Sequence, residues 1–119
     1  MKLRYIVLIF VLLATIQVNG QNYPGTNLRG RIATFYYQQQ VPLVSAKVDL
    51  YFFDRTRPVG YQWILVASTL TDAYGFYFFR GINPQYYTIW VNQLKSYNIQ
   101  VLFIDYRYFA YQDLPQFIF

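Results

Sequence analysis

The sequence predicts an all-β domain, built as a sandwich or a barrel of short antiparallel strands. Tyr, Phe and Trp make up 23% of the chain, and these residues, like Val, Ile and Thr, favour strands. Turn-forming residues recur at short intervals, and apolar residues show helical spacing nowhere after residue 20. Short apolar runs between regular turns are typical of β-sandwiches and barrels.

The first twenty residues are predicted to form an export signal that is removed from the mature protein. Lys2 and Arg4 supply its basic start, residues 5–14 its apolar segment, and Gly20 a small residue for cleavage before Gln21. An uncleaved membrane anchor is the alternative, but the apolar segment at residues 5–14 is short for a span and polar residues follow it. We therefore expect a secreted, periplasmic or cell-surface protein with no stable membrane span after cleavage.

Residues 21–119 are predicted to form a single domain, since their number suits one modest core. The whole chain carries a formal net charge of +5, and its basic residues are scattered singly, which argues against nucleic-acid binding. The chain contains no cysteine, no histidine and no glutamate. The usual zinc ligands and a Ser–His or Cys–His catalytic pair are therefore missing, and we predict a non-enzymatic protein without a cofactor or metal ion.

Three strands are predicted in the first half of this domain, at residues 28–36, 46–53 and 63–71. Turn-forming segments separate them, including residues 54–58 with the sequence DRTRP. Side chains in a strand alternate between two faces and charged groups avoid the core, so Lys47 and Asp49 are assigned to the solvent side. The opposite, inward set is Ala46, Val48, Leu50 and Phe52.

The second half is predicted to supply strands at residues 76–80, 87–92 and 99–106, with a short terminal strand at 116–119. Asn83-Pro84 and Lys95-Ser96 provide turns between them. Alternation within residues 87–92 gives a less polar face, which is predicted to point inward. This inward set is Tyr87, Ile89 and Val91.

Residues 71–75, with the sequence TDAYG, are predicted to turn the chain between two antiparallel strands. Asp72 at the first corner is suited to accept a hydrogen bond from the backbone N–H two residues on, and Gly75 permits a positive φ. A catalytic or metal-binding role is the alternative for Asp72, but the other acids lie in separate segments. We therefore assign Asp72 and Gly75 a structural role in the turn.

Two stretches, GRIATFYYQQQVPLVSAKVDLYFF and VASTLTDAYGFYFFRGINPQYYTIWV, carry an ordered set of strand and turn residues. The set is Gly30, Pro42, Ala46, Val48, Leu50, Thr71, Asp72, Gly75, Tyr77, Phe79, Tyr87, Thr88 and Val91. It resembles a carboxypeptidase regulatory-like domain over nearly all of the chain after the export signal, although Asn83-Pro84-Gln85-Tyr86 lacks the family's Pro-x-Gly turn. The resemblance implies an Ig-like or transthyretin-like (prealbumin-like) antiparallel β-sandwich of about seven strands, with Tyr77 and Phe79 facing inward. It also implies a non-catalytic role in interaction or scaffolding.

Aromatic rings are unusually frequent among the predicted outward-facing side chains. The set is Tyr51, Phe53, Phe76, Phe78 and Trp90. Together such rings can form an interaction patch, because they offer a large contact area at low cost in rotamer entropy. The alternative is that the rings pack as cross-strand pairs, or that a loop such as residues 55–62 covers them.

Two functions are consistent with such a patch. The first is a secreted, non-catalytic structural or interaction module that binds a protein partner or contributes to a cell-surface assembly. The second is a small carbohydrate-binding module, in which polar side chains such as Lys47, Thr88 and Asn92 would hold glycan hydroxyl groups beside the rings. Self-association through exposed sheet edges is a further alternative, because the strands are rich in aromatic residues and carry little charge.

Overall fold

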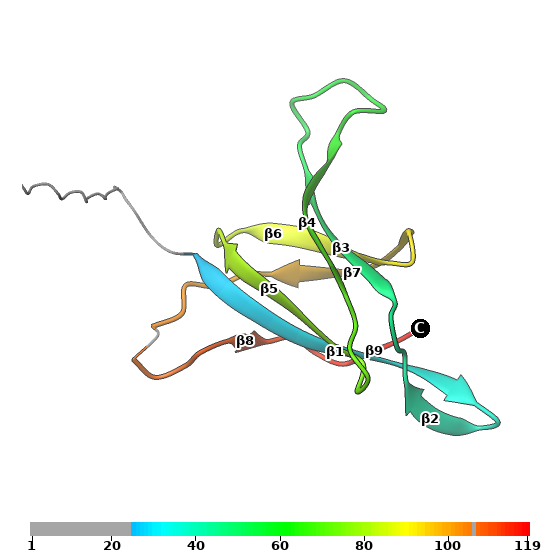
Figure 1. Cartoon of the computed structure of the whole chain (residues 1–119). Coiled ribbons are helices and arrows are strands. Elements are labelled where there is room, and N and C mark those ends of the chain that lie inside the picture. The colour runs from blue at the N-terminus through cyan, green and yellow to red at the C-terminus, as the bar shows by residue number, and fades with distance from the viewer. Residues whose placement is uncertain (1–24, 106) are drawn as a thin grey trace, which may run out of the picture.

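The computed structural model describes residues 25–105 and 107–119, and the predicted export signal at residues 1–20 lies outside them. Within these ranges the protein is all-β, with nine strands in two facing sheets, which confirms the predicted β-sandwich (Figure 1). No helix in the described ranges is long and apolar enough to cross a membrane. The strands are β1 (Thr26–Tyr36), β2 (Gln39–Pro42), β3 (Lys47–Phe53), β4 (Trp63–Leu70), β5 (Phe76–Ile82), β6 (Tyr86–Val91), β7 (Leu94–Gln100), β8 (Gln112–Asp113) and β9 (Phe117–Ile118).

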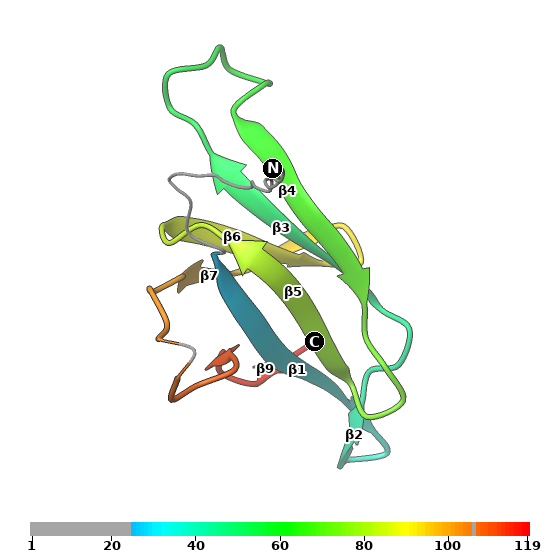
Figure 2. The same ribbon diagram turned by 60° about the vertical axis from the view of Figure 1, so that its left-hand side comes forward.

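The two sheets differ in how they are assembled. One is built around β1, which pairs antiparallel with β2 and β5 and parallel with the two-residue strands β8 and β9. The other has the order β4-β3-β6-β7, with every pair antiparallel. The C-terminal segment therefore returns to lie along the first strand, as Figure 2 shows for β9 and β1.

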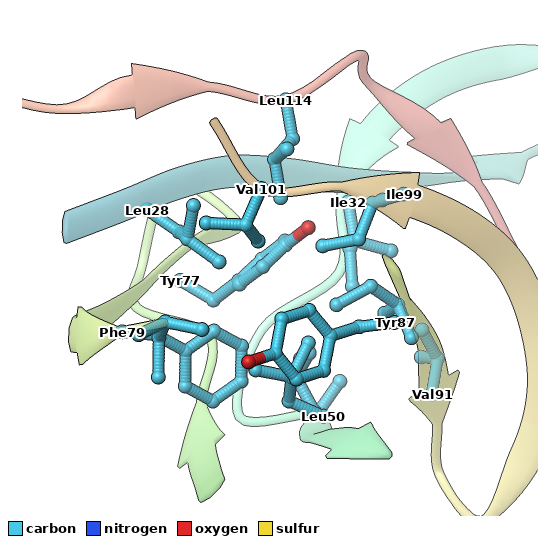
Figure 3. Close-up of a cluster of buried hydrophobic side chains, with 14 residues drawn as sticks. Leu28, Ile32, Leu50, Tyr77, Phe79, Tyr87, Val91, Ile99, Val101 and Leu114 are labelled. Atoms are coloured by element: carbon cyan, nitrogen blue, oxygen red, sulfur yellow. The ribbon is translucent and has the colours of Figure 1, made fainter. Parts of the chain in front are cut away.

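An apolar core fills the space between the two sheets (Figure 3). Leu28 and Ile32 enter it from β1, and Leu50 enters it from β3 on the facing sheet. Leu114, which follows β8, closes one side of the cluster. The predicted inward alternation is confirmed, because all but one of its members are buried and Phe52 is partly buried against the core. The buried members are Ala46, Val48, Leu50, Tyr77, Phe79, Tyr87, Ile89 and Val91.

Tyr77 links the two sheets through the middle of the core. Its ring lies so close to Gly30, its partner on β1, that a Cβ atom added there would come within 2.3 Å of the ring. Its hydroxyl forms a short hydrogen bond with the hydroxyl of Tyr97 on β7. Burial raises the pKa of both phenols above the usual range of tyrosine, since a phenolate would lose its hydration there. Glycine at position 30 therefore makes the space that this central ring occupies.

Two hairpins have tight two-residue turns. Tyr37 and Gln38 separate β1 from β2, and Asn92 and Gln93 separate β6 from β7; their φ values lie between 47° and 67°. Positive φ at both central residues is the requirement of a type I′ hairpin. β2 is absent from the sequence prediction because the run of glutamines at 38–40 looks like a turn, whereas only Gln38 belongs to one.

The strand after β6 begins earlier than the sequence predicts. The expected turn at Lys95-Ser96 is wrong, since both residues lie within β7, and the predicted strand at 99–106 ends at Gln100 instead. The β6–β7 register shifts between Ile89 and Trp90, which accommodates one extra residue on β7. β8 is also missing from the prediction, whereas β9 lies within the terminal strand predicted at 116–119.

The chain turns between β4 and β5 at residues 71–75. The Oδ1 atom of Asp72 accepts hydrogen bonds from the backbone N–H groups of Tyr74 (2.9 Å) and Phe76 (3.0 Å). Gly75 has a φ of 82°, and a Cβ atom added there would lie 2.5 Å from the carbonyl oxygen of Ile32. In this geometry the carboxylate of Asp72 bonds to the backbone of the segment that it turns.

Asp49 does not face solvent as the sequence predicts. It lies at an outward position of β3, but only 1% of its surface is exposed. Ser68 on β4 donates a hydrogen bond to its Oδ1 atom, and the Nζ atom of Lys47 lies 3.6 Å from Oδ2. Its register partner on β6 is Trp90. The carboxylate is therefore buried beneath its neighbours on the outer side of the sheet, with the polar partners that a buried charge requires.

Candidate interaction surfaces

The structure divides the five predicted outward aromatic residues between the two sheets. Tyr51, Phe53 and Trp90 lie on the β4-β3-β6-β7 sheet, whereas Phe76 and Phe78 lie on β5 of the other sheet. The two groups therefore do not form one patch. Each group has a different surrounding, and these surroundings determine what each can bind.

Four rings form one continuous cluster on the outer side of the β4-β3-β6-β7 sheet. The ring centroids of Tyr51 and Trp90 are 4.5 Å apart, those of Phe53 and Trp63 are 4.8 Å apart, and those of Trp63 and Trp90 are 5.7 Å apart. Contacts at these distances stabilise neighbouring strands as cross-strand pairs. Leu65, which is 51% exposed, extends the cluster along β4 opposite Tyr51. Leu70, which is 62% exposed, follows beyond Ser68 and lies opposite Lys47. We name this surface the aromatic face: Tyr51, Phe53, Trp63, Leu65, Leu70 and Trp90.

Trp63 is missing from the predicted set, and strand pairing is the signal that would have found it. Phe53 ends β3 and Trp63 begins β4, so the two face each other across the hairpin. The predicted strands at 46–53 and 63–71 already end at Phe53 and begin at Trp63. Alternation within one strand does not show which residues of the next strand lie opposite, but a hairpin between these two strands places Phe53 opposite Trp63.

Polar groups around the aromatic face are mostly paired with other protein groups. The backbone N–H of Lys47 donates to Oδ1 of Asn92 (3.0 Å), and the buried Asp49 is already bonded. Lys95 differs, because its Nζ atom lies 5.2 Å from the centroid of Trp63 and has no ion pair in the described part of the chain. The indole N–H of Trp90 is buried and has no hydrogen-bond partner within the same residues. The face thus offers apolar area and one unpaired cation.

Phe76 lies beneath an arginine on the other sheet. The guanidinium of Arg31 is 5.8 Å from the ring centroid of Phe76. It is held there by hydrogen bonds to the carbonyl of Tyr74 and to the side chain of Gln116, each 2.9 Å long. The ring therefore has a cation from β1 above it, and an amide from the C-terminal segment helps to hold that cation in place.

Phe78 packs against the C-terminal segment. Its ring centroid is 5.7 Å from that of Tyr111, and the guanidinium of Arg29 lies 5.5 Å from the Tyr111 ring. Arg29 also forms a bidentate ion pair with Asp113, whose hydrogen bonds raise the pKa of the arginine. Side chains of the C-terminal segment therefore lie beside both rings of this face, while Phe78 stays 39% exposed.

A groove of about 410 Å³ opens at one end of the aromatic face. Its walls come from the end of β3, the loop after β3, the start of β6 with the residue before it, and β7. Phe53 is shared between the groove and the aromatic face. The lining residues are Phe52, Phe53, Arg55, Gln85, Tyr86, Tyr87, Thr88 and Asn98.

Hydrogen bonds fix the polar side chains of the groove. Thr88 donates to Oδ1 of Asn98 (2.9 Å), its partner in the β6–β7 register. Gln85 donates through Nε2 to the hydroxyl of Tyr87 (3.0 Å), which donates to the carbonyl of Asn83 (2.8 Å). The amide NH₂ of Asn98 and the amide oxygen of Gln85 make no hydrogen bond within residues 25–105 and 107–119. One donor and one acceptor are therefore held ready in the groove.

Arg55 reaches the groove from the loop between β3 and β4, which projects beyond the sandwich in Figures 1 and 2. Asp54 shapes this loop by accepting hydrogen bonds from the backbone N–H (3.0 Å) and hydroxyl (2.6 Å) of Thr56, which lower the pKa of Asp54. Its backbone N–H donates to the carbonyl of Gln62 (2.8 Å). Arg55 itself has no hydrogen-bond or ion-pair partner among the described residues.

The β4-β3-β6-β7 sheet has two edge strands of different charge. β4 contains no charged residue, whereas β7 contains Lys95. A long uncharged edge is well suited to pairing with a further strand.

The described residues contain no group of three acidic, histidine or cysteine side chains that could hold a metal ion.

Comparisons with known proteins add little beyond the fold. No family model matches the chain, and no curated protein matches it either. Among solved structures, it is similar to a variant of BcpA, the major pilin subunit of Bacillus cereus, with a TM-score of 0.45 and 12% sequence identity. The match covers 82% of this chain but only 30% of the pilin chain. A similarity this low carries no information about function.

Proposed function

We propose that this protein is a secreted, non-catalytic interaction module of the carboxypeptidase regulatory-like kind that binds a protein partner through the aromatic face. The observation that carries the proposal is the continuous cluster of four rings from three strands, extended by two exposed leucines. Aromatic residues gathered in one apolar patch are typical of the centres of protein interfaces, where a few rings supply most of the binding energy.

The aromatic face favours a partner that presents apolar side chains together with a carboxylate. Lys95 lies above Trp63 and has no acidic partner in the described residues, while the neighbouring Lys47 is already close to Asp49. An acidic side chain at the rim of a partner would be the counter-ion of Lys95. Such a charge would chiefly increase the association rate and the selectivity of binding.

A glycan fits the aromatic face less well than a protein does. Glycan sites need free hydrogen-bonding groups beside the rings. Thr88 instead bonds to Asn98, and the Oδ1 atom of Asn92 accepts from the backbone of Lys47. The carbohydrate-binding alternative therefore lacks polar support on this surface.

Two features support a place in a cell-surface assembly. The sequence of residues 1–20 predicts export, and β4 presents an uncharged edge beside the aromatic face. If the signal is removed as predicted, the mature protein begins near Gln21. Mass spectrometry of the secreted protein measures its first residue and tests this. Size-exclusion chromatography over a range of concentrations measures self-association directly, so that a second copy can be distinguished from another partner.

The proposal is tested by capture of cell-surface proteins on the immobilised protein. Leu65→Ser removes apolar area from the aromatic face, and Leu102→Ser is its matched control, because the two leucines are 51% and 50% exposed. We expect one discrete protein to be retained by wild type and by L102S, and its affinity to fall about tenfold with L65S. Equal retention by all three forms, or retention that is lost when the extract is deglycosylated, would argue against a protein-binding aromatic face.

A further inference from the structure

We propose that the groove beside the aromatic face binds a short saccharide that carries a carboxylate, such as a uronic-acid disaccharide. This goes beyond the protein-binding role, because the groove has free amide groups and an arginine without a partner among the described residues beside its rings. Its volume of about 410 Å³ falls in the range of small-molecule sites. Three properties of its walls lead to this ligand: exposed rings, fixed amides and an unpaired cation.

The rings give the groove surfaces on which a sugar can stack. Phe53 and Tyr86 line it with 37% and 70% of their surfaces exposed. Phe52 and Tyr87, from the inward side of the same two strands, also line the groove with their ring centroids 6.3 Å apart, and Tyr87 is buried. The apolar C–H face of a pyranose can therefore stack on the exposed ring of Phe53 or Tyr86.

The amides give the groove one donor and one acceptor for sugar hydroxyl groups. Because Asn98 accepts from Thr88 through Oδ1, its NH₂ group remains a donor. Because Gln85 donates to Tyr87 through Nε2, its Oε1 atom remains an acceptor. A hydroxyl group can both donate and accept, so it suits this pair better than a purely apolar ligand does.

Arg55 gives the groove its preference for an anion. Its guanidinium has no partner among the described residues, and it stands on a loop that Asp54 holds in shape. A planar guanidinium matches a carboxylate with two parallel hydrogen bonds. Rings, amides and a cation in one groove thus point to an acidic sugar rather than a neutral one.

The test is calorimetric or NMR titration of the exported protein with digalacturonic acid, and with lactose as a neutral disaccharide. We expect digalacturonic acid to bind at least about tenfold more tightly than lactose, since the ion pair is lost with the neutral sugar. Arg55→Gln should remove this preference. Arg57→Gln is the matched control, because it makes the same charge change in the same loop outside the groove lining, and it should change the affinity less than about twofold.

Several results would overturn the proposal. These are failure of both sugars to bind, equal affinity for both, equal loss in R55Q and R57Q, or preference for an acidic tetrapeptide over digalacturonic acid. The outcome is also separable from that of the protein-binding proposal. L65S should leave sugar binding unchanged, and R55Q should leave capture of the protein partner unchanged, so either proposal can fail alone.

Discussion

The two outer faces of the sandwich carry similar rings in different surroundings. Phe53 on one face and Phe78 on the other have almost the same exposed fraction, 37% and 39%. Phe53 contacts Trp63, which belongs to a cluster of rings. Phe78 contacts Tyr111, which Arg29 covers in turn. The two rings are therefore equally accessible, and they differ in what surrounds them: other rings beside Phe53, and a tyrosine and an ion pair of the C-terminal segment beside Phe78.

The cover on the β1 sheet comes from the end of the chain. The segment from Tyr111 to Phe119 lies along β1 through two short parallel pairings and contributes Leu114 to the core. No comparable segment crosses the aromatic face in the described residues. The two faces therefore differ because the C-terminal segment runs along β1 and not along the other sheet. Substitutions that loosen this segment should make the two faces more alike.

Leu114→Ala is expected to have the largest effect, because Leu114 is the side chain that the C-terminal segment buries in the core. Leu114 is 9% exposed, and its backbone N–H donates to the carbonyl of Arg29 (2.8 Å). Loss of a buried leucine should lower the free energy of unfolding by about 2–4 kcal/mol, measured by urea denaturation. Ile118→Ala, 39% exposed in the same segment, is the control and should cost less than half as much. Similar losses in the two variants would show that Leu114 does not hold the segment more firmly than Ile118 does.

Alkaline pH should have the next largest effect, because it acts on Tyr77 and Tyr97, whose hydroxyl groups meet between the two sheets. Tyr77 and Tyr97 have raised pKa values in the folded protein, whereas the phenols of the unfolded chain ionise near pH 10. Above about pH 10 the unfolded state therefore binds fewer protons than the native state, and stability falls as the pH rises. The expected slope is about 1.4 kcal/mol per pH unit for each buried tyrosine, measured by denaturation at pH 9 to 11.

Tyr97→Phe is the control for the alkaline effect. The variant loses the hydroxyl contact but keeps the ring, which stacks on Phe117 at 4.9 Å between centroids. Its stability should fall less steeply above pH 10 than that of wild type, since one buried phenol is gone. An unchanged slope would mean that Tyr97 ionises freely in the folded protein.

Asp113→Asn is expected to have the smallest effect. It breaks the ion pair with Arg29 on the covered face, and both side chains are largely exposed. Exposed ion pairs contribute little to stability and are screened by salt. The melting temperature should therefore fall slightly in dilute buffer and match that of wild type in 1 M salt. A large fall that persists in salt would show that Arg29 and Asp113 hold the C-terminal segment in place by more than charge.

Much of the fold could be predicted because β1, β3, β4, β5 and β6 leave regular sequence patterns. Alternation in β3 identified its inward side, and the Asp72–Gly75 segment marked the boundary between β4 and β5. β7 could not be placed in the same way, because its polar residues Lys95 and Ser96 resemble a turn. A bulge opposite Ile89 and Trp90 also interrupts its alternation. Asp49 was misjudged for a related reason, since the size of its neighbours on adjacent strands determines its burial.

The candidate surfaces were harder to predict than the fold. Trp63 joins the aromatic face through pairing across a hairpin, and Lys95 reaches it from β7, the strand that was misplaced. The groove brings together residues 52, 53, 55, 85–88 and 98, which come from three separate segments of the sequence. A single sequence shows no signal for such an assembly, because only the order of the strands in the sheet makes these residues neighbours.

Both tryptophans of the chain, Trp63 and Trp90, belong to the aromatic face, and their rings touch. Light at 295 nm excites tryptophan selectively, so the intrinsic emission of the protein reports on this surface and on little else. Docking on the face will change the wavelength or intensity of that emission, while events at the Phe78 side will leave it nearly unchanged. The protein thus contains its own optical sensor at the place where we expect a partner to bind.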